Sequence, residues 1–184
     1  MSDLLDVIKN RRSIRHYQDR EVPREALHQV LEAVRWSPSW NNSQCWEIVV
    51  VKDPEVKLKL QKTMPMINPA ARCIVEAPLV LAMCGKLQIS GFFKGHPLTK
   101  FADWFMFDLG LATQSLCLAA HNEGLGTVIA GAFDHEKAKE VLQVPEGYEV
   151  VVLIPMGYPD RSSGPQPAGK SVNSFTTANS KELW

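Results

Sequence analysis

Three arginines and a serine lie within five consecutive positions near the start of the chain: Arg11, Arg12, Ser13 and Arg15. A guanidinium group can bind a phosphate with two parallel hydrogen bonds, and a hydroxyl adds a further donor. The cluster follows a short apolar run, residues 4–8, whose spacing is typical of one helix face. Because cations are also favoured at the C-terminal end of any helix, the segment alone leaves two interpretations open, a phosphate-binding cluster and a solvated helix end.

The loop of residues 37–46 (SPSWNNSQCW) is the second segment that could do chemistry. It has no helical or strand periodicity, and serine, proline and asparagine dominate it, which is typical of a loop. It also carries several amide and hydroxyl groups and two tryptophans, Trp40 and Trp46. Loops held between rigid elements often bind ligands. A plain connector would have the same composition, so both interpretations stay open.

The overall composition excludes several classes of function. Lys and Arg number 20, and Asp and Glu also number 20, so no net charge attracts nucleic acid or an anionic membrane. The four cysteines are far apart and no Cys/His spacing resembles a zinc site, so we predict no metal centre. The N-terminus lacks the features of a signal peptide, and no apolar run could span a bilayer. We therefore expect a cytoplasmic protein with reduced thiols.

The common catalytic and nucleotide-binding motifs are absent. The glycines at 124 and 126 begin like a dinucleotide fingerprint, but Ile129 stands where its third glycine belongs. Gly126 and Gly131 have P-loop spacing, but Ala132 stands where the lysine belongs. We find no nucleophile elbow and no HExxH motif. An enzyme without these groups usually carries its chemistry on a bound cofactor, and we name no catalytic side chain.

Hydrophobic periodicity and turn residues predict the order of the elements. Helices are expected at residues 4–10, 22–35, 53–60, 101–122 and 134–142, and strands at 47–51, 77–84, 127–130 and 149–156. Asp53 and Asp134 are the predicted N-caps of their helices. This order predicts one α/β or α+β domain over residues 1–184, with a sheet covered by helices and an extended tail at 160–184.

Two of these segments carry more specific expectations. Residues 101–122 are apolar nearly all round, which predicts a buried helix, either in the centre of the core or against a second subunit. Residues 88–100 mix glycine, proline and polar residues, which predicts a mobile surface segment or lid.

Taken together, four blocks of sequence resemble the nitroreductase family of flavoproteins. Residues 11–17 resemble its "RRSxRxF" element, and residues 37–46 are similar to its "APSxxNxQPW" loop, with Cys45 where proline is usual. Residues 101–127 resemble the family's long helix and the "GLGt" segment that follows it. Residues 154–159 match its "iplGYP" strand end. The blocks occur in the family's order and cover nearly the whole chain.

The resemblance implies an α+β, nitroreductase-like fold: a central, mostly antiparallel sheet flanked by helices, with a long buried helix in the core or dimer interface. It further implies one FMN per subunit and a homodimer with both sites at the interface. The implied activity is that of an FMN-dependent NAD(P)H oxidoreductase. NADH or NADPH would give a hydride to flavin N5 and leave, and a nitroaromatic or quinone-like acceptor would follow. The alternatives are other redox chemistry on the same fold, such as dehydrogenation or dehalogenation, and a flavin-binding protein with little turnover.

The resemblance also implies roles for particular residues. Arg11, Ser13 and Arg15 would hold the FMN phosphate and ribityl chain, with Arg12 beside them. Lys170 resembles the family's C-terminal phosphate cation, although Val172 stands where a second basic residue is common.

Other residues are implied to approach the isoalloxazine ring. From the partner subunit these are Pro38, Ser39 and Asn42. Ala130 and Gly131 would offer backbone N–H groups near flavin N5 or O4. Asn68 is expected at the pyrimidine edge, with Arg72 as an alternative cation there. Trp40 either stacks near the acceptor or packs in the interface.

Overall fold

The computed structural model describes residues 3–160 and residue 162. Its helices are α1 (Leu4–Asn10), α2 (Arg24–Arg35), the short 3₁₀ turn η1 (Trp40–Asn42), α3 (Pro54–Gln61), α4 (Ala71–Glu76), α5 (Phe105–Asn122) and α6 (His135–Leu142). Its strands are β1 (Trp46–Val51), β2 (Leu79–Lys86), β3 (Phe92–Phe93), β4 (His96–Pro97), β5 (Gly126–Thr127) and β6 (Tyr148–Gly157). Within the described residues no helix is both long and apolar enough to cross a membrane.

The central sheet has four strands in the order β1-β2-β6-β5, and every neighbouring pair is antiparallel. The register places Ala82 of β2 opposite Val49 of β1 and Leu153 of β6. β2 is buried along seven of its eight residues. Its continuous apolar sequence, which predicts a strand covered on both faces, is explained by this central position. The fold is therefore α+β with an antiparallel sheet, as the family resemblance implies.

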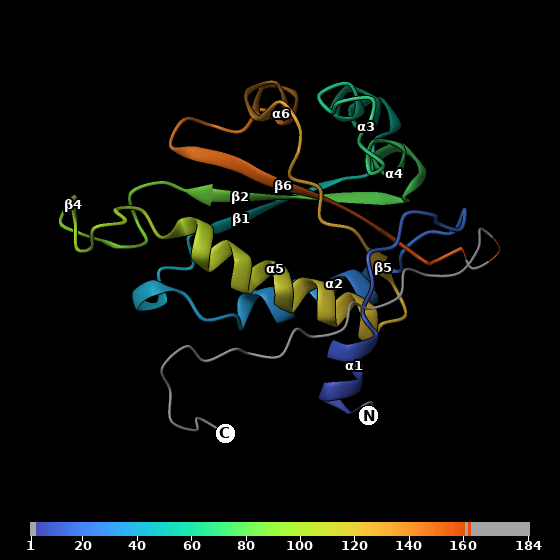
Figure 1. Cartoon of the computed structure of the whole chain (residues 1–184), viewed down its shortest axis with the longest axis horizontal. Helices are drawn as coiled ribbons and strands as arrows, with labels where there is room; N and C mark the ends of the chain where they lie inside the picture. The colour runs from blue at the N-terminus through green and yellow to red at the C-terminus, as the bar shows by residue number, and fades with distance from the viewer. Residues whose placement is uncertain (1–2, 161, 163–184) are drawn as a thin grey trace, which may run out of the picture.

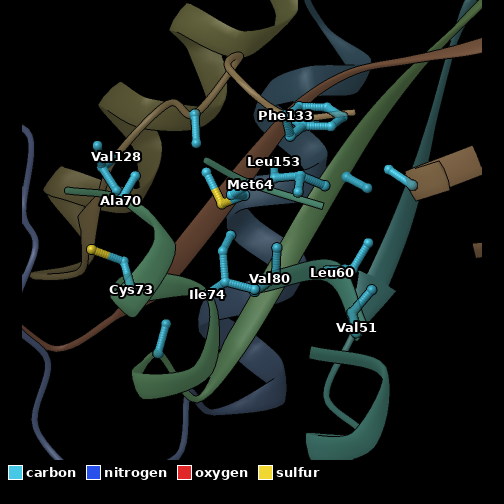
Figure 2. Close-up of a cluster of buried hydrophobic side chains, with 14 of the residues drawn as sticks. Val51, Leu60, Met64, Ala70, Cys73, Ile74, Val80, Val128, Phe133 and Leu153 are labelled. Carbon is cyan, nitrogen blue, oxygen red and sulfur yellow. The ribbon is translucent and has the colours of Figure 1, made fainter. Parts of the chain in front are cut away.

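Helices cover both faces of the sheet (Figure 1). α3, α4 and α6 lie on one face, and α2 and α5 lie on the other. Figure 2 shows the core beneath the first group, where Leu60, Ile74 and Leu153 are fully buried. The second core, between the sheet and the α2–α5 pair, is centred on residues such as Leu81 and Leu116. The sheet is thus held between two apolar layers that fix the loops at its ends.

Local capping follows the sequence closely. Asp53 accepts a hydrogen bond from the Glu55 N–H at 2.8 Å and begins α3. Asp134 accepts one from the Lys137 N–H at 3.1 Å and begins α6. Both predicted N-caps are confirmed.

The start of the long helix needs correction. The long helix begins at Phe105 and not at 101, because Asp103 and the left-handed Ala102 fold the preceding residues into a turn. Within one chain its outer side is not covered, since Phe107 is 58% exposed, and its burial against a second subunit stays a prediction. The segment of residues 88–100 contains a short hairpin, β3–β4, and its role as a mobile surface segment or lid stays a prediction. The six-residue helix α4, which follows Pro65 and Pro69, was not predicted from the sequence.

Candidate functional site

The arginine-rich segment, residues 11–17, is fixed along the free edge of β5. Ser13 bridges Thr127 in parallel, and the Ile14 N–H donates to the Thr127 carbonyl at 2.9 Å. The close approach requires glycine at Gly126, because a Cβ there would lie 2.6 Å from the Ile14 side chain. The segment therefore extends the sheet by one short bridge, which gives its side chains defined positions.

The arginines of this segment have different surroundings. The Arg12 guanidinium donates to the Arg11 carbonyl at 2.8 Å and to the Lys9 carbonyl at 2.5 Å, so it caps the end of α1. This is the helix-end role that the composition alone also allows. Arg15 is different, because its Nε is buried and has no hydrogen-bond partner among the described residues. A buried donor without an acceptor is costly, so this atom indicates a partner that is not part of the described chain.

Arg11 lies close enough to the C-terminal end of α5 for its charge to act on His121. Burial lowers the pKa of His121 in the last turn of that helix, and the charges of Arg11 and Arg12 lower it further. The predicted phosphate cluster is thus spread over two places. The charges of Arg11 and Arg12 act on His121 at the end of α5, whereas Arg15 lines a pocket whose lining includes neither of them.

Arg15 opens into a pocket of about 770 Å³, within the roughly 300–1,000 Å³ typical of ligand sites. The lining residues are Arg15, His16, Gln61, Lys62, Met64, Met66, Ile67, Asn68, Pro69, Ala71 and Arg72. Three of them are Arg or Lys and, among these described residues, none is an acid. Such a lining favours an anionic or oxygen-rich ligand.

Asn68 and Arg72 both line this pocket, so the structure brings together the two candidates between which the sequence could not choose. The Asn68 amide donates to the Ala132 carbonyl at 3.1 Å and accepts from the Ala70 N–H at 2.9 Å. It therefore joins the rim of the pocket to the loop after β5. Arg72 is paired with Glu76 and lies 3.0 Å from His16 Nδ1.

The loop after β5 corrects one prediction. The Ala130 N–H already donates to the Leu153 carbonyl at 2.9 Å, so it is not available to a ligand as the sequence analysis expected. The Gly131 N–H has no acceptor among the described residues. A Cβ at Gly131 would meet only Val152, at 3.8 Å, so the chain's own packing does not require glycine there. The structure thus leaves Gly131 as the available donor of the pair.

The loop of residues 37–46 lies elsewhere, against the N-terminal part of α5. Pro38 and Ser39 line a smaller pocket of about 230 Å³, together with Trp40, Trp104, Phe107, Asp108 and Leu111. The Trp40 and Trp104 rings are 5.0 Å apart between centroids. Asn42 is exposed in the η1 turn with a φ of 53°. We refer to the rings of Trp40, Trp104 and Phe107 as the aromatic wall.

The two pockets do not meet within one chain. In Figure 1 the β3–β4 hairpin and the start of α5 lie at one end of the molecule, and α4 lies at the other. The structure therefore does not bring Pro38, Ser39 and Asn42 together with Arg15 and Asn68. Lys170 lies outside the described residues. No group of His, Cys, Asp or Glu among the described residues could hold a metal ion.

Sequence reasoning missed Asp108, which is 1% exposed. Its carboxylate accepts hydrogen bonds from the Trp40 N–H at 3.0 and 3.2 Å, from the Ser90 hydroxyl at 2.6 Å and from the Ser43 hydroxyl at 3.3 Å. The Cys45 thiol lies 3.5 Å from the same carboxylate. A single acid inside an otherwise apolar helix was the signal that could have identified it.

Comparison with known proteins decides the family. The model of the nitroreductase family matches residues 8–158. This chain belongs to the nitroreductase family. A protein of Methanothermobacter thermautotrophicus named NADH dehydrogenase/NAD(P)H nitroreductase is 33% identical over 166 residues, covering 88% of this chain and 80% of that protein.

Solved structures of other family members are also similar to this chain. A nitroreductase family protein from Clostridium novyi superposes with a TM-score of 0.78 at 26% identity, covering 88% of each chain. An FMN-dependent nitroreductase from Clostridium difficile does so with a TM-score of 0.71 at 26% identity, covering 92% of each chain. In the present chain, all the predicted site residues except Lys170 lie within residues 8–158, the range that the family model matches.

Proposed function

We propose that this protein is an FMN-dependent NAD(P)H oxidoreductase that reduces nitroaromatic or quinone-like acceptors, and that it works as a homodimer. Family membership and the FMN-dependent relative support the cofactor and the oxidoreductase class. The observation that carries the proposal is the buried Nε of Arg15, which has no hydrogen-bond partner among the described residues and lies at a pocket whose described lining contains no acid.

The residues present fit FMN. The molecule carries a phosphate dianion and a ring edge with carbonyl oxygens and ring nitrogens, so it needs N–H donors and cations. Arg15, Asn68 and Arg72 supply such donors at the pocket. Arg11 and Ser13 extend the donor set along the same segment. Gly131 offers an N–H that has no acceptor among the described residues, and the residue carries no side chain of its own. These residues would hold the cofactor from one subunit.

A second copy of the chain would complete the site. Pro38, Ser39 and Asn42 are too far along the molecule to serve the same subunit's Arg15 pocket, so we assign them to the partner's cofactor. Exposed apolar side chains on α1 and α5 support such a dimer, among them Leu4, Leu5, Ile8, Met106 and Phe107. Burial of these residues against a second copy would remove apolar surface from water.

The chemistry that FMN supplies is hydride transfer at N5, received from NADH or NADPH and passed to the acceptor. The chain contributes position and charge. Arg15 and Arg72 stabilise negative charge in the pocket, and their fixed positions require no reorganisation during turnover. Gly131 can donate a hydrogen bond where a side chain would block approach. No side chain of the chain is assigned as a proton donor or base.

The direct test is the visible absorption spectrum of the purified protein, with chromatography of any ligand released by heat. We expect FMN, and we expect oxidation of NADH or NADPH with menadione or a nitroarene as the acceptor. Light scattering after size exclusion should give twice the chain mass. A protein that binds no FMN, even after incubation with it, would contradict the proposal.

Two intermediate results separate the alternatives. Bound FMN that NADH and NADPH reduce only slowly would favour another redox reaction on the same fold, such as dehalogenation or dehydrogenation. Bound FMN that is reduced quickly but turns over with no acceptor would favour a flavin-binding role.

A further inference from the structure

Asp108 connects two segments that are far apart in sequence. One is the loop of residues 37–46, which its carboxylate holds through the Trp40 N–H and the Ser43 hydroxyl. The other is the 88–104 segment, which it holds through the Ser90 hydroxyl at 2.6 Å. Ser90 is fully buried, so this hydrogen bond is shielded from water. Both segments therefore depend on one carboxylate on α5.

The position of each tryptophan of the aromatic wall follows from these bonds. Trp40 is held through its own backbone N–H. Trp104 is held through Ser90, whose carbonyl accepts the Trp104 N–H at 3.0 Å. Gly91 allows this approach, because a Cβ there would lie 2.6 Å from the Trp104 ring. The 5.0 Å separation of the two rings thus results from contacts that meet at Asp108.

The loop needs such an anchor. Asn41, Asn42 and Gln44 all have positive φ values, of 46°, 53° and 44°. Non-glycine residues in this region are strained and persist only where surrounding contacts hold them. The contacts that hold the loop include the carboxylate of Asp108, the Ser39 hydroxyl, which accepts the Gln44 N–H at 2.9 Å, and the Arg35 carbonyl, which accepts from the Gln44 side-chain amide at 3.3 Å.

We propose that Asp108 is a positioning residue that assembles the aromatic wall, and that the wall selects flat aromatic electron acceptors over compact non-aromatic ones. This inference rests on the proposed function. Tryptophan and phenylalanine rings favour offset or edge contacts with another flat ring. A wall of three such rings with a small pocket beside Pro38 and Ser39 suits a quinone or nitroarene, and gives no advantage to an inorganic acceptor.

The test compares Asp108→Asn and Ser90→Ala with the wild type as FMN-loaded proteins. The matched control is Gln114→Ala, an exposed position on the same helix. Each protein is assayed with menadione and with ferricyanide under the same NAD(P)H conditions. The Trp40–Trp104 pair is followed separately by its exciton couplet in far-ultraviolet circular dichroism. FMN content is measured for every variant.

We expect Asp108→Asn to raise the KM for menadione about tenfold, equivalent to about 1.4 kcal/mol, while the KM for ferricyanide changes less than about twofold. Ser90→Ala should raise the menadione KM about threefold, and Ser43→Ala, whose bond is longer, should raise it less. The exciton couplet should weaken in the same order. Gln114→Ala should match the wild type in every readout.

Several outcomes would overturn the inference. Equal changes in KM for both acceptors, or a loss of FMN with an intact couplet, would give Asp108 a general structural role. An unchanged couplet in Asp108→Asn would show that it does not position the rings. If Asp108→Asn fails to fold, Ser90→Ala decides alone, since it leaves the carboxylate in place. A wild type with an intact couplet and no turnover would instead contradict the proposed function.

Discussion

The Arg15 pocket and the aromatic wall differ in how their buried polar groups are satisfied. At Arg15 a buried donor, Nε, lacks an acceptor among the described residues. At the aromatic wall a buried acceptor, Asp108, is surrounded by donors from four residues, Trp40, Ser43, Cys45 and Ser90. The first region is incomplete without a ligand, whereas the second is complete within the chain. A ligand should therefore stabilise the Arg15 pocket strongly. Variants of the aromatic wall should change the selectivity between electron acceptors more than they change FMN affinity.

Arg15→Ala tests the incomplete region and should have the largest effect. A hydrogen bond from a charged group contributes about 1.5–3 kcal/mol, so FMN affinity should fall by about a hundredfold. The apo protein should be no less stable than wild type, because the variant removes an unsatisfied buried donor. Titration of apo protein with FMN, followed by flavin fluorescence, measures the affinity.

The control for this change is Arg24→Ala, an exposed arginine at the start of α2. Its FMN affinity should equal that of the wild type. If Arg15→Ala binds FMN as tightly as Arg24→Ala, the unpaired Nε does not indicate the cofactor. The Arg15 pocket would then not differ from the aromatic wall in its need for a ligand.

Gly126→Ala tests how the arginine segment is placed. The new Cβ would lie 2.6 Å from Ile14, so the segment must move away from β5. We expect a loss of about 2 kcal/mol in the free energy of unfolding, with weaker FMN binding as a consequence. Urea unfolding monitored by circular dichroism gives the free energy. Gly110→Ala is the control, since its added Cβ would meet no atom within 4 Å other than the backbone of its own helix and its chain neighbours.

Comparison of the sequence analysis with the structure shows which features local patterns encode. The long strands β1, β2 and β6 and the two N-caps were predicted because apolar runs and capping residues act over a few positions, as at Asp53. The short strands β3 and β4 were not predicted, and β5 ends at Thr127, before most of the strand expected at 127–130. The start of α5 was predicted too early, because Phe101 and Trp104 continue the apolar pattern while the left-handed Ala102 interrupts the backbone. Apolar pattern alone does not report backbone conformation.

The candidate site divides in the same way. The arginine segment was found because its residue types are concentrated within five positions. The different roles of Arg12 and Arg15 depend on which atoms each guanidinium meets, which only the folded chain determines. Asp108 was missed because its partners, Trp40 and Ser90, are 68 and 18 residues away. The Ala130 N–H is likewise used by a distant residue, since it donates to the Leu153 carbonyl of β6, and the local sequence does not show this pairing.

Trp40→Ala tests the self-contained region directly. The loss of one ring of the wall should raise the KM for an aromatic acceptor about tenfold, or about 1.4 kcal/mol, with little change in FMN affinity. Steady-state kinetics with menadione and FMN titration together separate the two effects. Trp36→Ala provides the control, because that ring is 76% exposed at the end of α2. Release of FMN or dissociation of the dimer in Trp40→Ala would show that the ring packs in the interface.

The smallest effect concerns Cys45, which lies beside Asp108. Burial, and then the neighbouring carboxylate, raises the pKa of its thiol from 9.0 to about 12. The folded state therefore holds this proton more tightly than the unfolded state, and the stability it contributes is present below pH 9 and is lost as the pH rises toward 12. At pH 10 the loss should be about 1 kcal/mol. Urea unfolding of wild type and Cys45→Ala at pH 8 and pH 10 measures it. The wild type should lose more stability than the variant between these two pH values, and equal losses would mean that burial and the neighbouring carboxylate do not raise the pKa of the thiol.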